Sequence, residues 1–127
     1  MTKEQYVDAK TARLLQEKGF TQQCEKFYLD SIMFSHWHGE VLPKDKPIYE
    51  CPTQQKALRW LREEHYILVF VLPCTDKLGN LAYCADILAW NEREGIYEPA
   101  WRSGDYYIYE EACEAGIQHA AKLITLS

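Results

Sequence analysis

The sequence lacks the features that mark several large classes of protein. Its longest apolar run, YILVFVL at residues 66–72, is far shorter than the roughly 20 residues that a transmembrane helix needs. No positively charged segment followed by an apolar one occurs near Met1, so no export signal is predicted. No low-complexity tract or internal repeat occurs either, which argues against a disordered chain and against a repeat array.

Positive charge is scarce and scattered. Fourteen Lys and Arg residues are dispersed among 19 Asp and Glu residues, which gives a formal net charge of −5. Proteins that bind a phosphate backbone usually carry clustered positive charge, so the sequence predicts no direct nucleic-acid partner. An acidic decoy for a nucleic-acid-binding enzyme would fit this charge, although no motif supports it.

Cysteines at metal-binding or redox spacing are absent. The five cysteines are odd in number, widely spaced and contain no C-x-x-C. They are Cys24, Cys51, Cys74, Cys84 and Cys113. This pattern argues against a disulfide framework and a zinc knuckle, and predicts reduced, mostly buried thiols in a cytoplasmic protein. No G-x-S-x-G, phosphate loop, dinucleotide fingerprint or H-E-x-x-H motif occurs, so no cofactor is predicted.

The strongest structural signal that is present lies in residues 52–72, where a capped helix runs into an apolar strand. Pro52 and Thr53 predict that the helix begins at the next residue, because the Thr53 hydroxyl can accept a hydrogen bond from a first-turn amide. The face expected to turn inward consists of Ala57, Leu58, Leu61 and His65, with Trp60 at its edge. Residues 66–72 then predict a strand that is covered on both faces and ended by Pro73.

Two further helices and several strands flank this unit. Helices are predicted over residues 6–18, ended by Gly19, and from Glu110 onward. The other strands are predicted at residues 26–34, 48–50, 81–91 and 105–109, with a short one within 92–104. Because turn signals in residues 73–80 predict a hairpin, at least one strand pair is antiparallel. The sequence therefore predicts one α+β domain over residues 1–127, with a small mixed or mainly antiparallel sheet of roughly three to five strands packed against about three helices.

Two of these stretches also carry a resemblance. Residues 52–67 (PTQQKALRWLREEHYI) and residues 109–124 (YEEACEAGIQHAAKLI) resemble a family of small uncharacterised proteins from gut bacteria of the Bacteroides type, many of them associated with prophages or other mobile elements. The matching pieces cover about a quarter of the chain, and an N-terminal helix that ends in KGF also fits. The family has no assigned activity, so the resemblance implies a cytosolic bacterial or phage accessory protein and no site residues.

The segment His36-Trp37-His38 has the sharpest pattern for chemistry. Two histidines at positions i and i+2 of an extended segment project to the same side, a spacing that a catalytic zinc site can use with a third ligand. The residues available for that role are Asp30, Glu40, Cys24 and Cys51. One functional hypothesis is therefore a small metal-dependent hydrolase that uses His36 and His38, with a carboxylate as third ligand or base. The simpler interpretation is a pair of exposed or hydrogen-bonded histidines in a loop.

Two other groups have two interpretations each. Cys51 can form a nucleophile pair in space with His36 or His38, although no motif supports it. Asp86 is a carboxylate in the middle of an apolar strand face, and would have a raised pKa and act as an acid or base if it were buried without a partner. The favoured interpretation of Asp86 is an ion pair with a nearby Arg or Lys, or a position at the rim of the sheet. Asp30 has the same ambiguity.

Aromatic residues are plentiful, with nine Tyr, four Trp and four Phe. The candidates for partner contact are Tyr97, Trp101, Tyr106 and Tyr107, which lie among acidic residues. Tyr and Trp bury a large area at low entropic cost and keep a polar tip, which suits a protein-contact surface, although half of them would line the core in the alternative interpretation. The leading hypothesis is a non-enzymatic accessory protein of a bacterium or mobile element that acts through protein–protein contacts and forms a homodimer.

Overall fold

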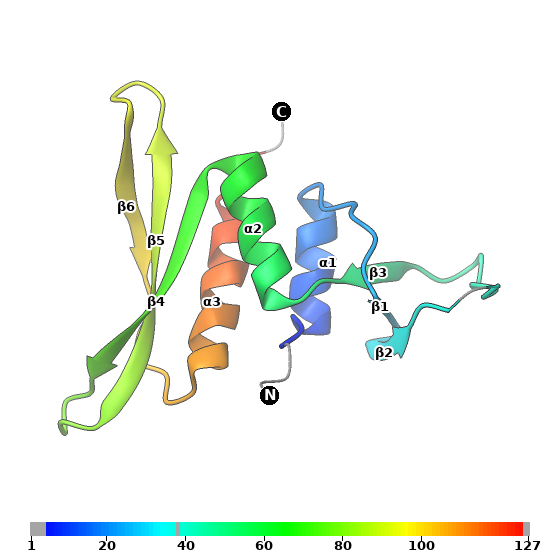
Figure 1. The fold of residues 1–127 in the computed structure, drawn as a ribbon, viewed down its shortest axis with the longest axis horizontal. Coiled ribbons are helices and arrows are strands. Elements are labelled where there is room, and N and C mark those ends of the chain that lie inside the picture. Colours follow the sequence, from blue (N-terminus) through cyan, green and yellow to red (C-terminus); the bar gives the residue numbers. More distant parts are fainter. Residues whose placement is uncertain (1–4, 38, 126–127) are drawn as a thin grey trace.

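Three helices lie between two antiparallel sheets in the computed structural model, which describes residues 5–37 and 39–125 (Figure 1). The elements in chain order are α1 (Ala9–Glu17), β1 (Lys26–Leu29), β2 (Ile32–Ser35), β3 (Ile48–Cys51), α2 (Gln54–His65), β4 (Ile67–Thr75), β5 (Leu81–Asn91), β6 (Ile96–Arg102) and α3 (Tyr109–Lys122). The strand orders are β2-β1-β3 and β4-β5-β6, with every pair antiparallel. The predicted α+β class is confirmed, and the strands are divided between two sheets.

The layers follow one another along the long axis of the molecule. Figure 1 shows the β4–β5–β6 sheet at one end, α3 and α2 beside it, then α1, and the β2–β1–β3 sheet at the other end. Helix α3 packs on β4 and β5, while α2 packs on α3 and β4, and α1 lies against α3 and β3. All three helices lie on one side of the β4–β5–β6 sheet. The helices therefore form the middle of the molecule and share one hydrophobic core.

The helix boundaries follow the local signals in the sequence. Thr53 Oγ1 accepts a hydrogen bond from the Lys56 amide at 3.1 Å, which satisfies one of the first-turn donors of α2. Gly19 follows the end of α1 with a φ of 101°, a left-handed conformation that glycine adopts without strain. At the end of α2, Tyr66 turns the chain into β4 with a φ of 53°. The predicted cap and the predicted glycine stop are both confirmed.

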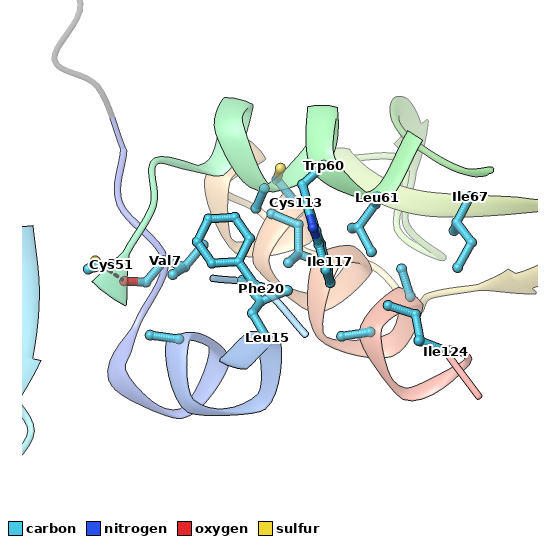
Figure 2. Packing of buried hydrophobic residues seen from close by; sticks show 14 of the residues in the cluster. Val7, Leu15, Phe20, Cys51, Trp60, Leu61, Ile67, Cys113, Ile117 and Ile124 are labelled. Carbon is cyan, nitrogen blue, oxygen red and sulfur yellow. Dashed lines mark hydrogen bonds between the residues drawn. The ribbon is translucent and has the colours of Figure 1, made fainter. Parts of the chain in front are cut away.

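The core is built from the facing sides of the three helices. The predicted stripe is buried and consists of Cys113, Ile117 and Ala120 of α3 and of Ile124 just after its end. Trp60 is only 5% exposed, which corrects its predicted position at the edge of the buried face. The rings of Phe20 and Trp60 pack edge to face, with 5.3 Å between their centroids. Figure 2 shows both rings among the side chains that the helices turn toward one another. The chain segment after α1 thus completes the core.

Residues 26–34, predicted as one strand, form a hairpin instead. Leu29 of β1 lies opposite Ile32 of β2, so Asp30 and Ser31 are the two residues of the turn. Both have positive φ values, 52° and 63°, as type I′ hairpin turns require. The prediction of one strand was wrong because Asp-Ser is a weaker turn signal than Asn-Gly or Asp-Gly, and apolar residues flank it on both sides.

Strand β4 leaves one face uncovered, with Phe70 and Leu72 at 44% and 39% exposed, which corrects the prediction that residues 66–72 are covered on both faces. It is also an edge strand. The Trp90 amide donates a hydrogen bond to the Tyr66 carbonyl at 3.1 Å. In this antiparallel register, the backbone groups of even-numbered β4 residues therefore form hydrogen bonds with β5. The amides of odd-numbered residues point to the free edge. Pro73 has no amide hydrogen and is therefore tolerated inside the strand, which continues to Thr75. Because apolar residues occupy both alternations, the sequence pattern could not show that one face is uncovered.

Candidate functional site

His36 follows β2 directly, and its ring is held between two carboxylates. Its Nδ1 lies 2.5 Å from Glu40 Oε2, and its Nε2 lies 2.9 Å from Glu50 Oε2. Because ionised carboxylates only accept hydrogen bonds, bonds at both ring nitrogens require both to carry a proton. The Phe27 ring packs against the imidazole with 4.4 Å between centroids. His36 therefore fits this site as an imidazolium cation between two anions.

The electrostatics of this cluster agree with that assignment. Burial by itself lowers the pKa of His36, but the hydrogen bonds to Glu40 and Glu50 outweigh it and raise the pKa above its ordinary value. The bond to His36 lowers the pKa of Glu40. Glu50 also accepts from the Cys24 amide at 2.9 Å, and Glu40 accepts from the Trp37 amide at 3.0 Å. The cluster thus ties the segment after β2 to β3 and to the segment before β1.

The candidate metal ligands that the structure describes do not converge on one point. The nitrogens of His36 face carboxylates on opposite sides of the ring, so His36, Glu40 and Glu50 cannot share one ion. Asp30 lies in the exposed β1–β2 turn and pairs with Lys46 at 2.9 Å. His38 lies outside the described residues. Within residues 5–37 and 39–125, no group of three or more His, Cys, Asp or Glu side chains is arranged to hold a metal ion.

The two cysteines named as candidate ligands do not contact His36 either. Cys51 Sγ lies 3.4 Å from the Val7 carbonyl oxygen, to which it donates (Figure 2). Side chains alternate along β3, so Cys51 points to the opposite face from Glu50 and from the His36 ring. Burial raises the pKa of Cys51 to about 11 and also raises the pKa of Cys24. A thiol with a raised pKa is a poor nucleophile, so this arrangement does not form the hypothesised Cys51–His36 pair.

Asp86 is engaged in an ion pair, as the favoured interpretation predicted. Arg102 lies opposite it on β6, and its guanidinium donates two hydrogen bonds, at 2.5 Å to Asp86 Oδ1 and 2.7 Å to Oδ2. These hydrogen bonds lower the pKa of the Asp86 carboxyl below its ordinary value. A carboxylate that stays ionised and is bonded to arginine cannot act as a general acid near neutral pH.

The four aromatic candidates for partner contact divide between two sides of the molecule. Trp101 lies on the helix side, where its indole stacks on His119 of α3 with 4.1 Å between centroids and 8° between planes. Tyr106 exchanges two backbone hydrogen bonds with Tyr83, at 2.7 and 2.8 Å, and extends the sheet beyond β6. Both residues therefore connect parts of this chain.

Tyr97 and Tyr107 are on the other side. The Tyr97 ring packs edge-on against Trp90, with 5.1 Å between centroids, and Tyr97 is 36% exposed. Tyr107 is 64% exposed and donates a hydrogen bond from its hydroxyl to Asp76 Oδ2 at 2.7 Å. Only these two of the four candidates are placed on the side of the sheet that faces away from the helices.

That side of the sheet is an apolar surface that sequence reasoning missed. The side chains of Val69 in β4 and Ala85 in β5 pack against Gly116 of α3. These two residues therefore point to the face of the sheet that the helices cover. Side chains alternate along a strand, so their neighbours lie on the opposite face, which we name the open face. The apolar members of the open face that are at least partly exposed are Leu68, Phe70, Leu72, Leu88, Trp90, Tyr97 and Pro99. Ala82 and Cys84 alternate onto the same side of β5 and are buried.

The open face is substantially exposed. Phe70, Leu72 and Trp90 are 44%, 39% and 42% exposed, and they come from two adjacent strands. The Asp86–Arg102 ion pair lies on the same face. No sequence pattern marks this surface, because β4 is apolar at every position from 67 to 72 and the location of the helices alone decides which alternation is buried.

Comparisons of the chain with protein-family models, with curated proteins and with solved structures found no match. Among the described residues, none of the helices combines the length and the apolar character that crossing a bilayer would need.

Proposed function

We propose that this protein is a non-enzymatic accessory protein that acts through protein–protein contacts, and that the open face is its contact surface. The uncovered apolar side of the β4–β5–β6 sheet is the observation that carries this proposal. Folded monomers rarely leave a contiguous apolar patch larger than a few hundred Å² in contact with water, and such patches mark interaction sites. Aromatic residues such as Trp90 and Tyr97 are also enriched at protein interfaces.

The state of the reactive side chains supports a non-enzymatic role. Both nitrogens of His36 are bonded to carboxylates, and the Asp86 carboxylate is bonded to Arg102. Burial raises the pKa of Cys51 and of Cys113. A catalytic site needs a nucleophile or a base that is available to a substrate. The His36 and Asp86 side chains are already bonded, and burial keeps the two thiols protonated near neutral pH. We therefore do not propose the metal-dependent hydrolase, and no structural feature favours the acidic decoy.

The cellular setting of the proposal comes from the sequence. The resemblance of residues 52–67 and 109–124 supports an accessory protein of a gut bacterium or of a mobile element such as a prophage. Free cysteines support a reducing compartment such as the cytoplasm. The dispersed charge supports a protein partner over nucleic acid.

Photo-crosslinking tests the proposal without assuming who the partner is. Phe70 is replaced by photoreactive p-benzoylphenylalanine, and the chain is expressed in a gut bacterium of the Bacteroides type and irradiated. Phe34 of β2 is the matched control, because it is the same residue type with the same exposed fraction, 44%, on the other sheet. We expect a covalent adduct with protein from position 70 and none from position 34. Absence of an adduct at position 70, or equal adducts at both positions, would refute the proposal.

A further inference from the structure

We infer that the open face is covered by a second copy of this chain, so that two β4–β5–β6 sheets pack face to face as a six-stranded sandwich. This inference rests on the proposed function and names the partner of the same surface. Stacked sheets lie about 10 Å apart, with side chains of the two inner faces interdigitating. Phe70, Leu72 and Trp90 would then fill the space between the sheets.

The charge of the open face is compatible with its own copy. Among the residues that β4, β5 and β6 place on this face, the charged ones are Asp86 and Arg102, and they pair with each other through two hydrogen bonds. A second open face therefore meets no unpaired charge, even though the chain as a whole carries −5. A partner selected by charge would need an unpaired charge to recognise, and this face offers an apolar surface instead.

The exposed area of the chain exceeds that of a typical folded monomer of its mass. By the size scaling of folded monomers, a chain of 14.9 kDa exposes about 7,000 Å², whereas this chain exposes 8674 Å². The excess of about 1,700 Å² is more than the roughly 800 Å² that each partner contributes to a standard interface. The open face is the larger of the two sheet surfaces that stand away from the helices, since β4 has nine residues and β2 has four.

Packing through the face is favoured over pairing through the edge. The free edge of β4 presents the amides of odd-numbered residues, and Pro73 interrupts that row because it has no amide hydrogen. A second copy added to this edge would lose a ladder bond at Pro73. The side chains of Phe70 and Leu72 would also stay exposed, so the apolar surface would not be buried.

The outward face of the β2–β1–β3 sheet is a poorer match for a second copy. Its exposed apolar residues on β2 are Ile32 and Phe34, at 59% and 44%. His36 and Glu50 form a charged pair at the same face, so an ion pair would be desolvated on either sheet, but the four-residue β2 offers fewer apolar side chains to offset that cost than the nine-residue β4. This sheet therefore supplies the control positions for the experiment.

Sedimentation velocity of the untagged full chain, from about 1 to 100 μM, tests the inference. We expect the wild type to sediment with twice the monomer mass of 14.9 kDa. Phe70→Lys should weaken the dimer by at least about 100-fold, as loss of a central aromatic anchor does. Lysine is chosen because it places a charge in the apolar surface, while its long side chain can reach solvent in the monomer. Phe34→Lys, at the same exposed fraction, should leave the dimer affinity within about threefold.

A second matched pair protects the test against misfolding. Leu72 on the open face and Leu123 after α3 are both 39% exposed. Leu72→Lys should weaken the dimer and Leu123→Lys should not, with circular dichroism confirming that each variant is folded. Hydrogen exchange distinguishes the two packing modes. Edge pairing would slow the exchange of the Val69 and Val71 amides in the wild-type dimer. Face packing would leave both exchange rates equal to those of the same amides in the monomeric Phe70→Lys variant.

Three outcomes would overturn the inference: a monomeric wild type at about 100 μM, a dimer that survives both Phe70→Lys and Leu72→Lys, and protection of the Val69 amide on association. Its failure is distinguishable from failure of the proposed function. If the purified chain is monomeric but position 70 crosslinks to another protein in cells, the proposed function stands and the partner is a different chain. If position 70 also gives no adduct, both are refuted.

Discussion

The backbone of Gly116 in α3 lies so close to Val69 in β4 that a methyl group on Gly116 would be 2.7 Å from Val69 Cγ1. The same methyl group would lie 3.0 Å from Ala85 Cβ on the neighbouring strand. Neither neighbour can easily move away, because a valine side chain is stiff at its first torsion and an alanine Cβ is fixed to the backbone. Gly116 therefore sets the distance between α3 and the β4–β5–β6 sheet, which carries the open face.

Substituting Gly116→Ala should destabilise the fold. Overpacking costs about 1–3 kcal/mol, and alanine gains roughly 1 kcal/mol over glycine in a helix interior. Because the added methyl group would lie only 2.7 Å from Val69 Cγ1, we expect a cost near the upper end of that range and a net loss of up to about 2 kcal/mol in the free energy of unfolding. Urea denaturation at fixed protein concentration measures it. Gly104→Ala is the control, since nothing lies within 4 Å of the added methyl group. If Gly116→Ala were as stable as the wild type, α3 would have to lie further from the sheet.

The His36 cluster predicts a pH dependence of stability with a defined sign. Hydrogen bonds to Glu40 and Glu50 outweigh the effect of burial and raise the pKa of folded His36 above its unfolded value. Its stabilising contribution is therefore complete below about pH 6.5 and lost as the pH rises through the raised folded pKa. We expect the stability difference between wild type and His36→Gln to be larger at about pH 5.5 than at about pH 9.

His65 provides a control of opposite sign. Burial lowers the pKa of His65 in the folded chain, so the unfolded chain binds the proton more tightly. The free energy of unfolding of the wild type should therefore decrease as the pH is lowered below about 6.5. His65→Gln should therefore lose less stability relative to wild type at low pH than at high pH. Urea denaturation across this range measures both variants, and parallel pH profiles for the two would contradict the assigned pKa directions.

The Asp86–Arg102 pair should contribute modestly to stability at neutral pH. Arg102→Gln removes the partner of a carboxylate whose side chain is 21% exposed, but the arginine itself is 66% exposed, so we expect a loss of only about 0.5–1 kcal/mol. The pKa of folded Asp86 is lowered, so this contribution exists above about pH 4 and is lost as the pH falls through the folded pKa. A double-mutant cycle with Asp86→Asn isolates the coupling, and a coupling of zero at neutral pH would show that the pair is not formed in solution.

Substitution of Trp101 should lower stability, whereas substitution of Tyr97 should weaken association, although both residues were candidates for partner contact. Trp101→Ala removes the ring that stacks on His119 and should lower the free energy of unfolding by about 2 kcal/mol, while leaving association unchanged. Tyr97→Ala truncates a side chain of the open face and should weaken association, with less than about 1 kcal/mol lost on unfolding. Unfolding and sedimentation of both variants at one protein concentration provide the test. Loss of association without destabilisation in Trp101→Ala would place it in the interface.

The sequence by itself determined the helices and the α+β class. The signals that define a helix lie within about four residues of each other along the chain, so the Thr53 cap, the Gly19 stop and the buried stripe of α3 were all predictable. The hairpin between β4 and β5 was predictable for the same reason, because its turn signals are local.

Only the tertiary structure decided which strand lies at the edge, which face stays open, and which side chains meet. Phe70 and Val69 are both apolar and adjacent in sequence, yet α3 covers Val69 and leaves Phe70 exposed. His36 and Glu50 are 14 residues apart, and Asp86 and Arg102 are 16 apart, so strand pairing alone brings each pair together. Such contacts depend on the register and order of strands, which are fixed by the packing of the whole chain and not by any local pattern.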